Sequence, residues 1–181
     1  MHATLADVIA DTAQNAIEAG ATKVDVSLSE VDGRIAVDIR DNGKGMDAAT
    51  AKRAFDPFYT EPGKHDKRKV GLGLPILKQI CEMCGGGVTL ESQKGVGTHL
   101  SYFFDAANID LPPMGDLAET LVTLFNYPGD FELSFAHRKG TESYSILRSE
   151  LADAIGGLET VEGIGLAKEF LHGQEEALNG T

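Results

Sequence analysis

An alternation of apolar and polar residues near the N-terminus is the pattern that most limits how this chain can fold. Within two runs, 22–31 and 34–40, apolar residues recur at every second position over 24–28 and 35–39, and Asp32-Gly33 separates the runs. A period of two predicts β-strands that bury one face, and an Asp-Gly pair between them favours a tight hairpin turn. Residues 4–19 place apolar side chains at helical spacing, so we expect an amphipathic helix ahead of the hairpin.

The rest of the chain predicts elements of both kinds. A polar segment, 56–69, has few periodic apolar residues and is expected to form a mobile lid. Pro112-Pro113 marks a boundary between a first unit, 1–108, and a small α+β unit, 109–181. Further strands are expected at 88–93, 98–104, 131–137 and 142–148. Further helices are expected at 47–54, from Gly71 to about Cys84, and at 116–125, 149–155 and 164–178.

Length, net charge and cysteine content limit the classes of protein to which this chain can belong. The 181 residues suffice for one medium domain, or for a domain of about 100 residues with an appendage. No apolar stretch approaches the length of a membrane span and no signal peptide is recognisable, so we expect a cytoplasmic protein with no membrane partner. The formal net charge of −12 argues against nucleic acid as a partner. Cys81 and Cys84 are expected to form a buried pair on a helix.

Four short segments, each next to a predicted helix or strand, are the strongest indication of function. In chain order they are Asp11-x3-Asn15, Asp41-Asn42-Gly43-x-Gly45-Met46, Gly71-Leu72-Gly73-Leu74 and Gly95-x-Gly97-Thr98. A lone glycine motif matches many unrelated turns, and their combination and order are more informative. Together they resemble the N, G1, G2 and GT boxes of the GHKL ATPase superfamily, which contains DNA gyrase, Hsp90, histidine kinases and MutL. The resemblance covers residues 4–104, and residues 56–60 look like the F box of histidine kinases.

The resemblance implies a Bergerat-type α/β sandwich, in which a mixed, mostly antiparallel sheet has helices on one face and ATP lies between the helical layer and the lid. Asp41 is expected to accept a hydrogen bond from the exocyclic amine of adenine, where guanine presents an acceptor. Gly43 and Gly45 remove side chains where the backbone approaches the flat base. Met46 belongs to the same box, and Thr98 is expected to lie near the adenine.

The other boxes are expected to hold the phosphates. Gly71, Leu72, Gly73 and Leu74 place backbone N–H groups at a helix N-terminus, where unpaired donors and the helix dipole favour anions. The resemblance assigns the side-chain oxygen of Asn15 to a magnesium ion between the phosphates. One protein ligand suffices, because magnesium prefers oxygen and keeps several waters.

A cluster of cations falls within the expected lid. Lys64, Lys67, Arg68 and Lys69 crowd one loop of an otherwise acidic chain. Two interpretations stay open: a solvated charged loop, or side chains that close over the triphosphate and stabilise its charge.

Asp11 lies one helical turn before Asn15 and determines which reaction is expected. The gyrase, Hsp90, MutL and anti-sigma-factor kinase branches place a glutamate there, which activates water or a serine hydroxyl, whereas histidine kinases usually carry a neutral residue. Aspartate is one methylene shorter, which reduces its reach by roughly 1.5 Å. A general base, an exposed helix carboxylate and a group that contacts magnesium indirectly all stay open for Asp11.

Two functions from different classes follow. The first is magnesium-dependent ATP hydrolysis, or transfer of the γ-phosphate to a partner protein by a serine-kinase-like reaction; a complete histidine kinase is not expected, since the chain begins almost at the N box. The second is a non-catalytic, ATP-gated interaction module. Residues 109–181 are expected to dock a protein partner or a second copy in a homodimer.

Overall fold

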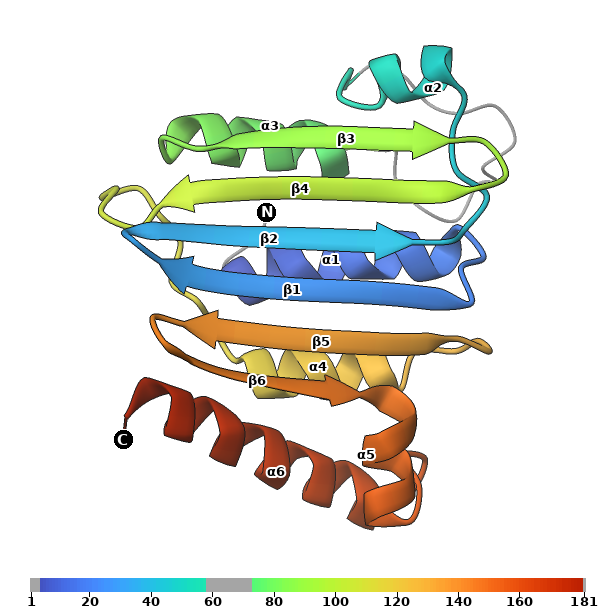
Figure 1. Cartoon of the computed structure of the whole chain (residues 1–181), viewed down its shortest axis with the longest axis vertical. Coiled ribbons are helices and arrows are strands. Elements are labelled where there is room, and N and C mark those ends of the chain that lie inside the picture. The colour runs from blue at the N-terminus through green and yellow to red at the C-terminus, as the bar shows by residue number, and fades with distance from the viewer. Residues whose placement is uncertain (1–3, 58–72, 181) are drawn as a thin grey trace.

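The computed structural model describes residues 4–57 and 73–180, whose strands form one mixed six-stranded sheet in the order β3-β4-β2-β1-β5-β6 (Figure 1). The strands are β1 (Lys23–Val31), β2 (Arg34–Asp41), β3 (Gly87–Gln93), β4 (Gly97–Asp105), β5 (Glu132–Lys139) and β6 (Glu142–Leu147). Neighbouring strands are antiparallel except β1 and β5, which run parallel. The predicted mixed, mostly antiparallel sheet is therefore confirmed.

The hairpin of β1 and β2 forms as its alternation predicts. Val31 pairs with Arg34, which leaves Asp32 and Gly33 as a two-residue turn with φ angles of 52° and 73°. Positive φ at both positions is the requirement of a type I′ turn, and an Asp-Gly pair meets it at little cost. The apolar residues of each strand point to one face and are buried there.

Helices cover that buried face, and the opposite face of the sheet is not covered by any described helix (Figure 1). The helices are α1 (Leu5–Glu18), α2 (Ala48–Arg53), α3 (Gly73–Met83), α4 (Leu117–Phe125), α5 (Arg148–Ile155) and α6 (Val161–Asn179). Thr4 and Asp7 start α1 with a reciprocal capping box. The last helix begins three residues before the expected 164, because the hydroxyl of Thr160 accepts from the N–H of Gly163 and caps it there.

The C-terminal strands extend the same sheet rather than forming another one. The parallel pairing of β5 with β1 gives β1 a second neighbour, and α4 packs on α1. The junction at the two prolines is tied to the start of α1, since Leu5 N donates to Pro113 O and Ala6 N donates to Met114 O. The core is continuous across the boundary expected near residue 108: it includes Ile9 and Val26 from one side and Phe135 from the other.

The two cysteines are a buried part of this core. Cys81 lies on α3 and Cys84 directly follows it, and both are at most 1% exposed. Burial raises the pKa of the Cys81 thiol to about 12, so the thiol stays protonated at neutral pH. None of the described helices is long and apolar enough to cross a membrane.

Candidate functional site

A half-buried carboxylate marks the end of β2. Asp41 pairs in register with Thr98 on β4, and its Oδ1 accepts from the backbone N–H of Gly43 at 2.8 Å. Burial raises the pKa of Asp41, and the N–H groups of Gly43 and Thr98, which bond to the carboxylate, oppose that rise. The result is an oriented hydrogen-bond acceptor at the C-terminal end of β2, an interior strand of the sheet. Adenine recognition would require such an acceptor.

Ser92 joins the two loops on either side of this carboxylate, and no sequence motif indicated it. Its hydroxyl accepts from Met46 N at 2.8 Å, donates to Gly97 O at 3.0 Å, and lies 2.9 Å from Thr98 Oγ1. Because the single hydroxyl proton is used on Gly97, Thr98 donates to Ser92 in this arrangement. In the sequence, Ser92 is distinguished only by its position two residues after Leu90 near the end of a strand. Side chains two apart in a strand point to the same face, so Ser92 is a polar residue on the inward face.

Glycines in these loops are required by contacts within the chain. A Cβ on Gly45, where φ is 58°, would lie 2.0 Å from Gln93 O. A Cβ on Gly97, where φ is 139°, would lie 2.0 Å from Asp41 O. These approaches are far inside van der Waals contact, so the two loops close on each other only without side chains. The glycines therefore allow the two loops to pack against each other. This role was not part of the sequence-based expectation, in which glycines in this region leave space for the adenine base.

A second set of hydrogen bonds fixes the loop after Asp41 to neighbouring elements. Asn42 Oδ1 accepts from Thr22 N and Lys23 N at 2.9 Å each, just ahead of β1 and at its first residue. Lys44 N donates to Ala19 O at 3.0 Å, at the end of α1. The segment is thereby held between α1 and the sheet.

The N-terminus of α3 lies against the polar side of α1. A Cβ built on Gly73, the first residue of α3, would be 2.8 Å from Asp11 Oδ2 and 3.7 Å from Asn15 Nδ2. Asp11 is half-buried and Asn15 is exposed. The structure thus brings the predicted N box and the start of the predicted phosphate helix together. The side chain of Leu74 packs against the hydrophobic core.

Several predicted site residues fall outside the described residues. They are Gly71 and Leu72 of the phosphate box and the cationic residues Lys64, Lys67, Arg68 and Lys69. The same holds for most of the segment expected to form a lid.

Helix α1 connects the two parts of the candidate site, the loop after Asp41 and the region where Asp11 and Asn15 lie beside α3. The loop after Asp41 contacts Ala19, since a Cβ on Gly43 would lie 2.9 Å from the Ala19 Cβ. Asn15 lies one helical turn before Ala19 and Asp11 two turns before it, a span of about 12 Å along the helix axis. An elongated ligand with a base at one end and anionic groups at the other suits this arrangement.

The residue types around α1 and α3 fit a magnesium ion bound together with phosphates. Asp11 offers a side-chain oxygen beside the start of α3, and Asn15 places its side-chain amide there. Within residues 4–57 and 73–180, no three His, Cys, Asp or Glu side chains gather as a metal site. Magnesium does not need such a cluster, because phosphate and water oxygens complete its coordination.

These features define an α/β sandwich whose candidate site lies between strand ends and helix ends. The sequence model described as histidine kinase-, DNA gyrase B-, and HSP90-like ATPase matches residues 2–108, which is more than half of the chain. The chain belongs to this family and carries an ATPase domain of the histidine kinase type.

Individual relatives agree with this assignment. The heme sensor protein HssS of Staphylococcus saprophyticus is 41% identical over 92 residues, which is 50% of this chain and 20% of HssS. The sensor histidine kinase YvrG of Bacillus subtilis is 31% identical over 84 residues, which is 46% of this chain and 14% of YvrG. The chain therefore matches a fifth or less of the length of these two proteins.

One solved structure shares the fold over most of the chain. The N-terminal domain of a DNA repair protein superposes with a TM-score of 0.55 at 14% identity, covering 89% of this chain and 58% of that one. This coverage exceeds the segment 2–108. The likeness in fold therefore includes part of the C-terminal half, for which the sequence showed no resemblance.

Proposed function

We propose that the chain binds ATP with magnesium and transfers the γ-phosphate to water or to a partner protein in a serine-kinase-like reaction. One observation supports this most directly: the start of α3 lies against Asp11 and Asn15. A carboxylate and an amide thus flank a helix N-terminus, where unpaired N–H groups bind phosphate oxygens.

Each side chain has a role in the proposal. Asp41 accepts from the amine of adenine, and Asn15 provides an oxygen to magnesium, which neutralises phosphate charge. Asp11 takes the proton from the attacking hydroxyl. Gly73 carries no side chain, so the short aspartate can approach the first turn of α3 closely. Gly71, Leu72 and the lysines and arginine of 64–69 complete the phosphate site in this proposal.

The proposal extends to a protein partner and a location. Residues 109–181 would dock the phosphate acceptor or a second copy of the chain. Apolar side chains on α6 support such a role, since Leu166 is 43% and Phe170 45% exposed. A cytoplasmic location belongs to the same proposal, because ATP and magnesium are abundant there.

The test is incubation of the full chain with γ-labelled ATP and magnesium, with free phosphate and labelled protein counted over hours. Loss of phosphate release in Asp11→Asn, with ATP still bound, supports Asp11 as the base. Asn15→Ala should lose the magnesium dependence of ATP binding. The control is Asp32→Asn, the same chemical change in a hairpin turn where asparagine tolerates the positive φ.

The outcomes separate the two candidate classes. Release that persists unchanged in Asp11→Asn rules out Asp11 as the base. ATP that is bound without release or labelling, even with added candidate acceptor, favours the ATP-gated interaction module. Absence of ATP binding at millimolar concentration overturns both.

A further inference from the structure

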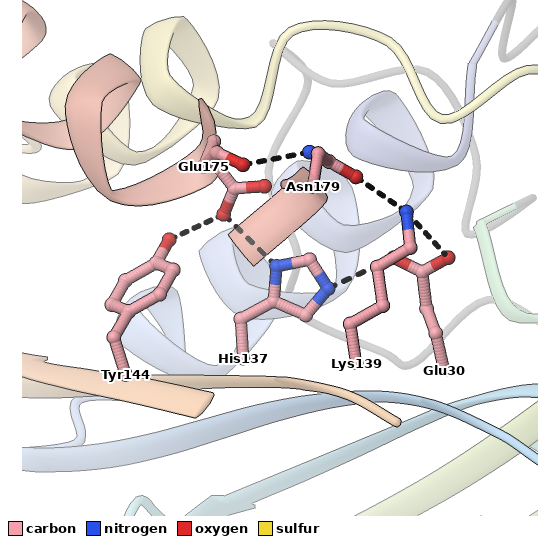
Figure 2. A network of polar contacts seen from close by, with 6 residues as sticks. All are labelled: Glu30, His137, Lys139, Tyr144, Glu175 and Asn179. Atoms are coloured by element: carbon pink, nitrogen blue, oxygen red, sulfur yellow. Dashed lines mark hydrogen bonds and ion pairs between the residues drawn. The ribbon is translucent and has the colours of Figure 1, made fainter. Parts of the chain in front are cut away.

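A buried histidine joins the last helix to the sheet. His137, on β5, is 1% exposed, and both of its ring nitrogens face carboxylates (Figure 2). Its Nδ1 lies 2.9 Å from Glu175 Oε1 on α6, and its Nε2 lies 2.9 Å from Glu30 Oε1 on β1. The imidazole therefore bridges three elements that are distant in sequence.

Counting donors assigns the protonation state of this ring. An ionised carboxylate only accepts, so two carboxylates at hydrogen-bond distance need two N–H donors, and only the imidazolium has both. Glu30 is ionised in this arrangement because Lys139 Nζ lies 3.9 Å from its other oxygen. The Tyr144 hydroxyl donates to Glu175 Oε1 at 2.5 Å, so the oxygen that faces His137 Nδ1 already serves as a hydrogen-bond acceptor.

The charges around the ring balance only when it is protonated. The facing groups are Glu30 from β1, Lys139 from β5, Tyr144 from β6, and Glu175 and Asn179 from α6. Two carboxylates, one lysine and one imidazolium sum to zero, and a neutral ring would leave one uncompensated negative charge. Farther out, His172 of α6 lies 3.6 Å from Asp116 at the start of α4.

The shifts in pKa agree with this geometry. Burial by itself lowers the pKa of His137, but the hydrogen bonds to Glu175 and Glu30 outweigh it and the net pKa is raised. The hydrogen bond from His137 lowers the pKa of Glu30. Burial raises the pKa of Tyr144, so its hydroxyl remains a donor.

We propose that His137 is a protonation-dependent clamp, which holds α6 on the sheet while its ring is charged and releases the helix when the ring loses its proton. A hollow of about 390 Å³ beside the clamp, lined in part by Glu30, Lys139 and Glu175, lets water reach the groups once they separate. Along α6 only a narrow apolar strip is buried, which includes Ala167, Leu171 and Leu178. This proposal does not depend on the nucleotide chemistry.

The direction of the pH dependence follows from linkage. A raised folded pKa means that the histidine contributes its full stability below the ordinary pKa of about 6.5 and loses it as pH rises through the folded value. Glu30 acts oppositely, since its lowered pKa contributes above the ordinary carboxyl pKa and is lost as pH falls. Docking of α6 is therefore firmest in the pH range that lies above the ordinary carboxyl pKa of Glu30 and below the ordinary pKa of His137.

The test is a pH titration of the full chain by NMR, following the His137 ring proton and the backbone amides of α6. His137 should titrate above pH 6.5, and the α6 amides should lose protection from exchange with the same midpoint, after correction for intrinsic exchange rates. A midpoint at or below 6.5, or α6 amides that remain protected through it, overturns the proposal.

Two variants separate the clamp from a purely structural histidine. Glu175→Gln removes one carboxylate and should lower the His137 midpoint by about one pH unit, a tenfold change in proton affinity, with the release of α6 moving equally. His172→Gln, on the same helix, should leave both midpoints unchanged. An unchanged midpoint in Glu175→Gln contradicts the clamp, and if that variant does not fold, the wild-type titration alone decides.

Discussion

The two halves of the sheet use their polar side chains in opposite ways. In the N-terminal half, Asp41, Thr98 and Asn15 lie at strand or helix ends and are half-buried or exposed. In the C-terminal half, His137 and Glu175 lie between the sheet and α6, where they satisfy each other's hydrogen bonds. Every buried polar side-chain atom in the described part of the chain has a hydrogen-bond partner.

This difference separates the proposed ligand site from a structural contact. The closed network around His137 stabilises the position of one helix. At the other end, side chains such as Ser92 hold loops in place, while the groups that would contact a ligand remain at the surface. Both halves nevertheless share one hydrophobic core. A core substitution in either half therefore tests whether the two halves unfold independently.

The largest expected effect comes from that shared core. Phe135 is fully buried on β5, and Phe135→Ala should lower the free energy of unfolding by about 3–5 kcal/mol. Urea unfolding should still show one transition by circular dichroism and by tyrosine fluorescence, because both halves lose the same core. Phe170→Ala, at an exposed position of α6, should cost less than about 1 kcal/mol. Two separate transitions would divide the chain into independent units.

The next effect belongs to the nucleotide site alone. Asp41→Ala should weaken ATP binding by about 30- to 150-fold, the equivalent of about 2–3 kcal/mol for a charge-assisted hydrogen bond. Isothermal calorimetry measures this directly. Asp38→Ala, on the same strand but paired with His99 on the uncovered face, should leave the affinity unchanged. Equal ATP affinity in the two variants would show that Asp41 does not contact the nucleotide.

Ser92 offers a smaller and more structural test. Ser92→Ala removes the contacts to Met46, Gly97 and Thr98 and should cost about 1–2 kcal/mol of stability. ATP affinity should fall by less than in Asp41→Ala, since Ser92→Ala keeps Asp41, the proposed adenine acceptor. Thermal and urea unfolding provide the measurement, and Ser101→Ala on the uncovered face of β4 is the matched control. A stability equal to that of the control would show that Ser92 does not hold the loops together.

The smallest effect concerns the ligand-free protein. Because burial raises the pKa of Asp41 above its unfolded value, its contribution to stability is present below the unfolded pKa and is lost as pH rises through the folded pKa. Asp41→Asn should therefore gain stability relative to wild type at neutral pH, by less than about 1 kcal/mol, and lose this gain in acid. Unfolding free energies from pH 3 to pH 7 test the sign. A difference that does not change with pH would contradict it.

The sequence by itself determined most of the helices and strands, and it selected the residues of the candidate site. Alternation and helical spacing are local patterns, so the β1–β2 hairpin and α1 lie close to where they were expected. Asp41, Asn15 and Gly73 could be chosen because short segments of the chain carry them together with their neighbours.

Only the tertiary structure decided which distant segments meet. Glu30 and His137 are 107 residues apart, and His137 and Glu175 are 38 apart, so no local pattern links them. The parallel pairing of β5 with β1, and with it the single sheet, depends on the same kind of long-range contact. Periodicity records which face of an element is buried, whereas the partner on that face is set by how all elements pack at once.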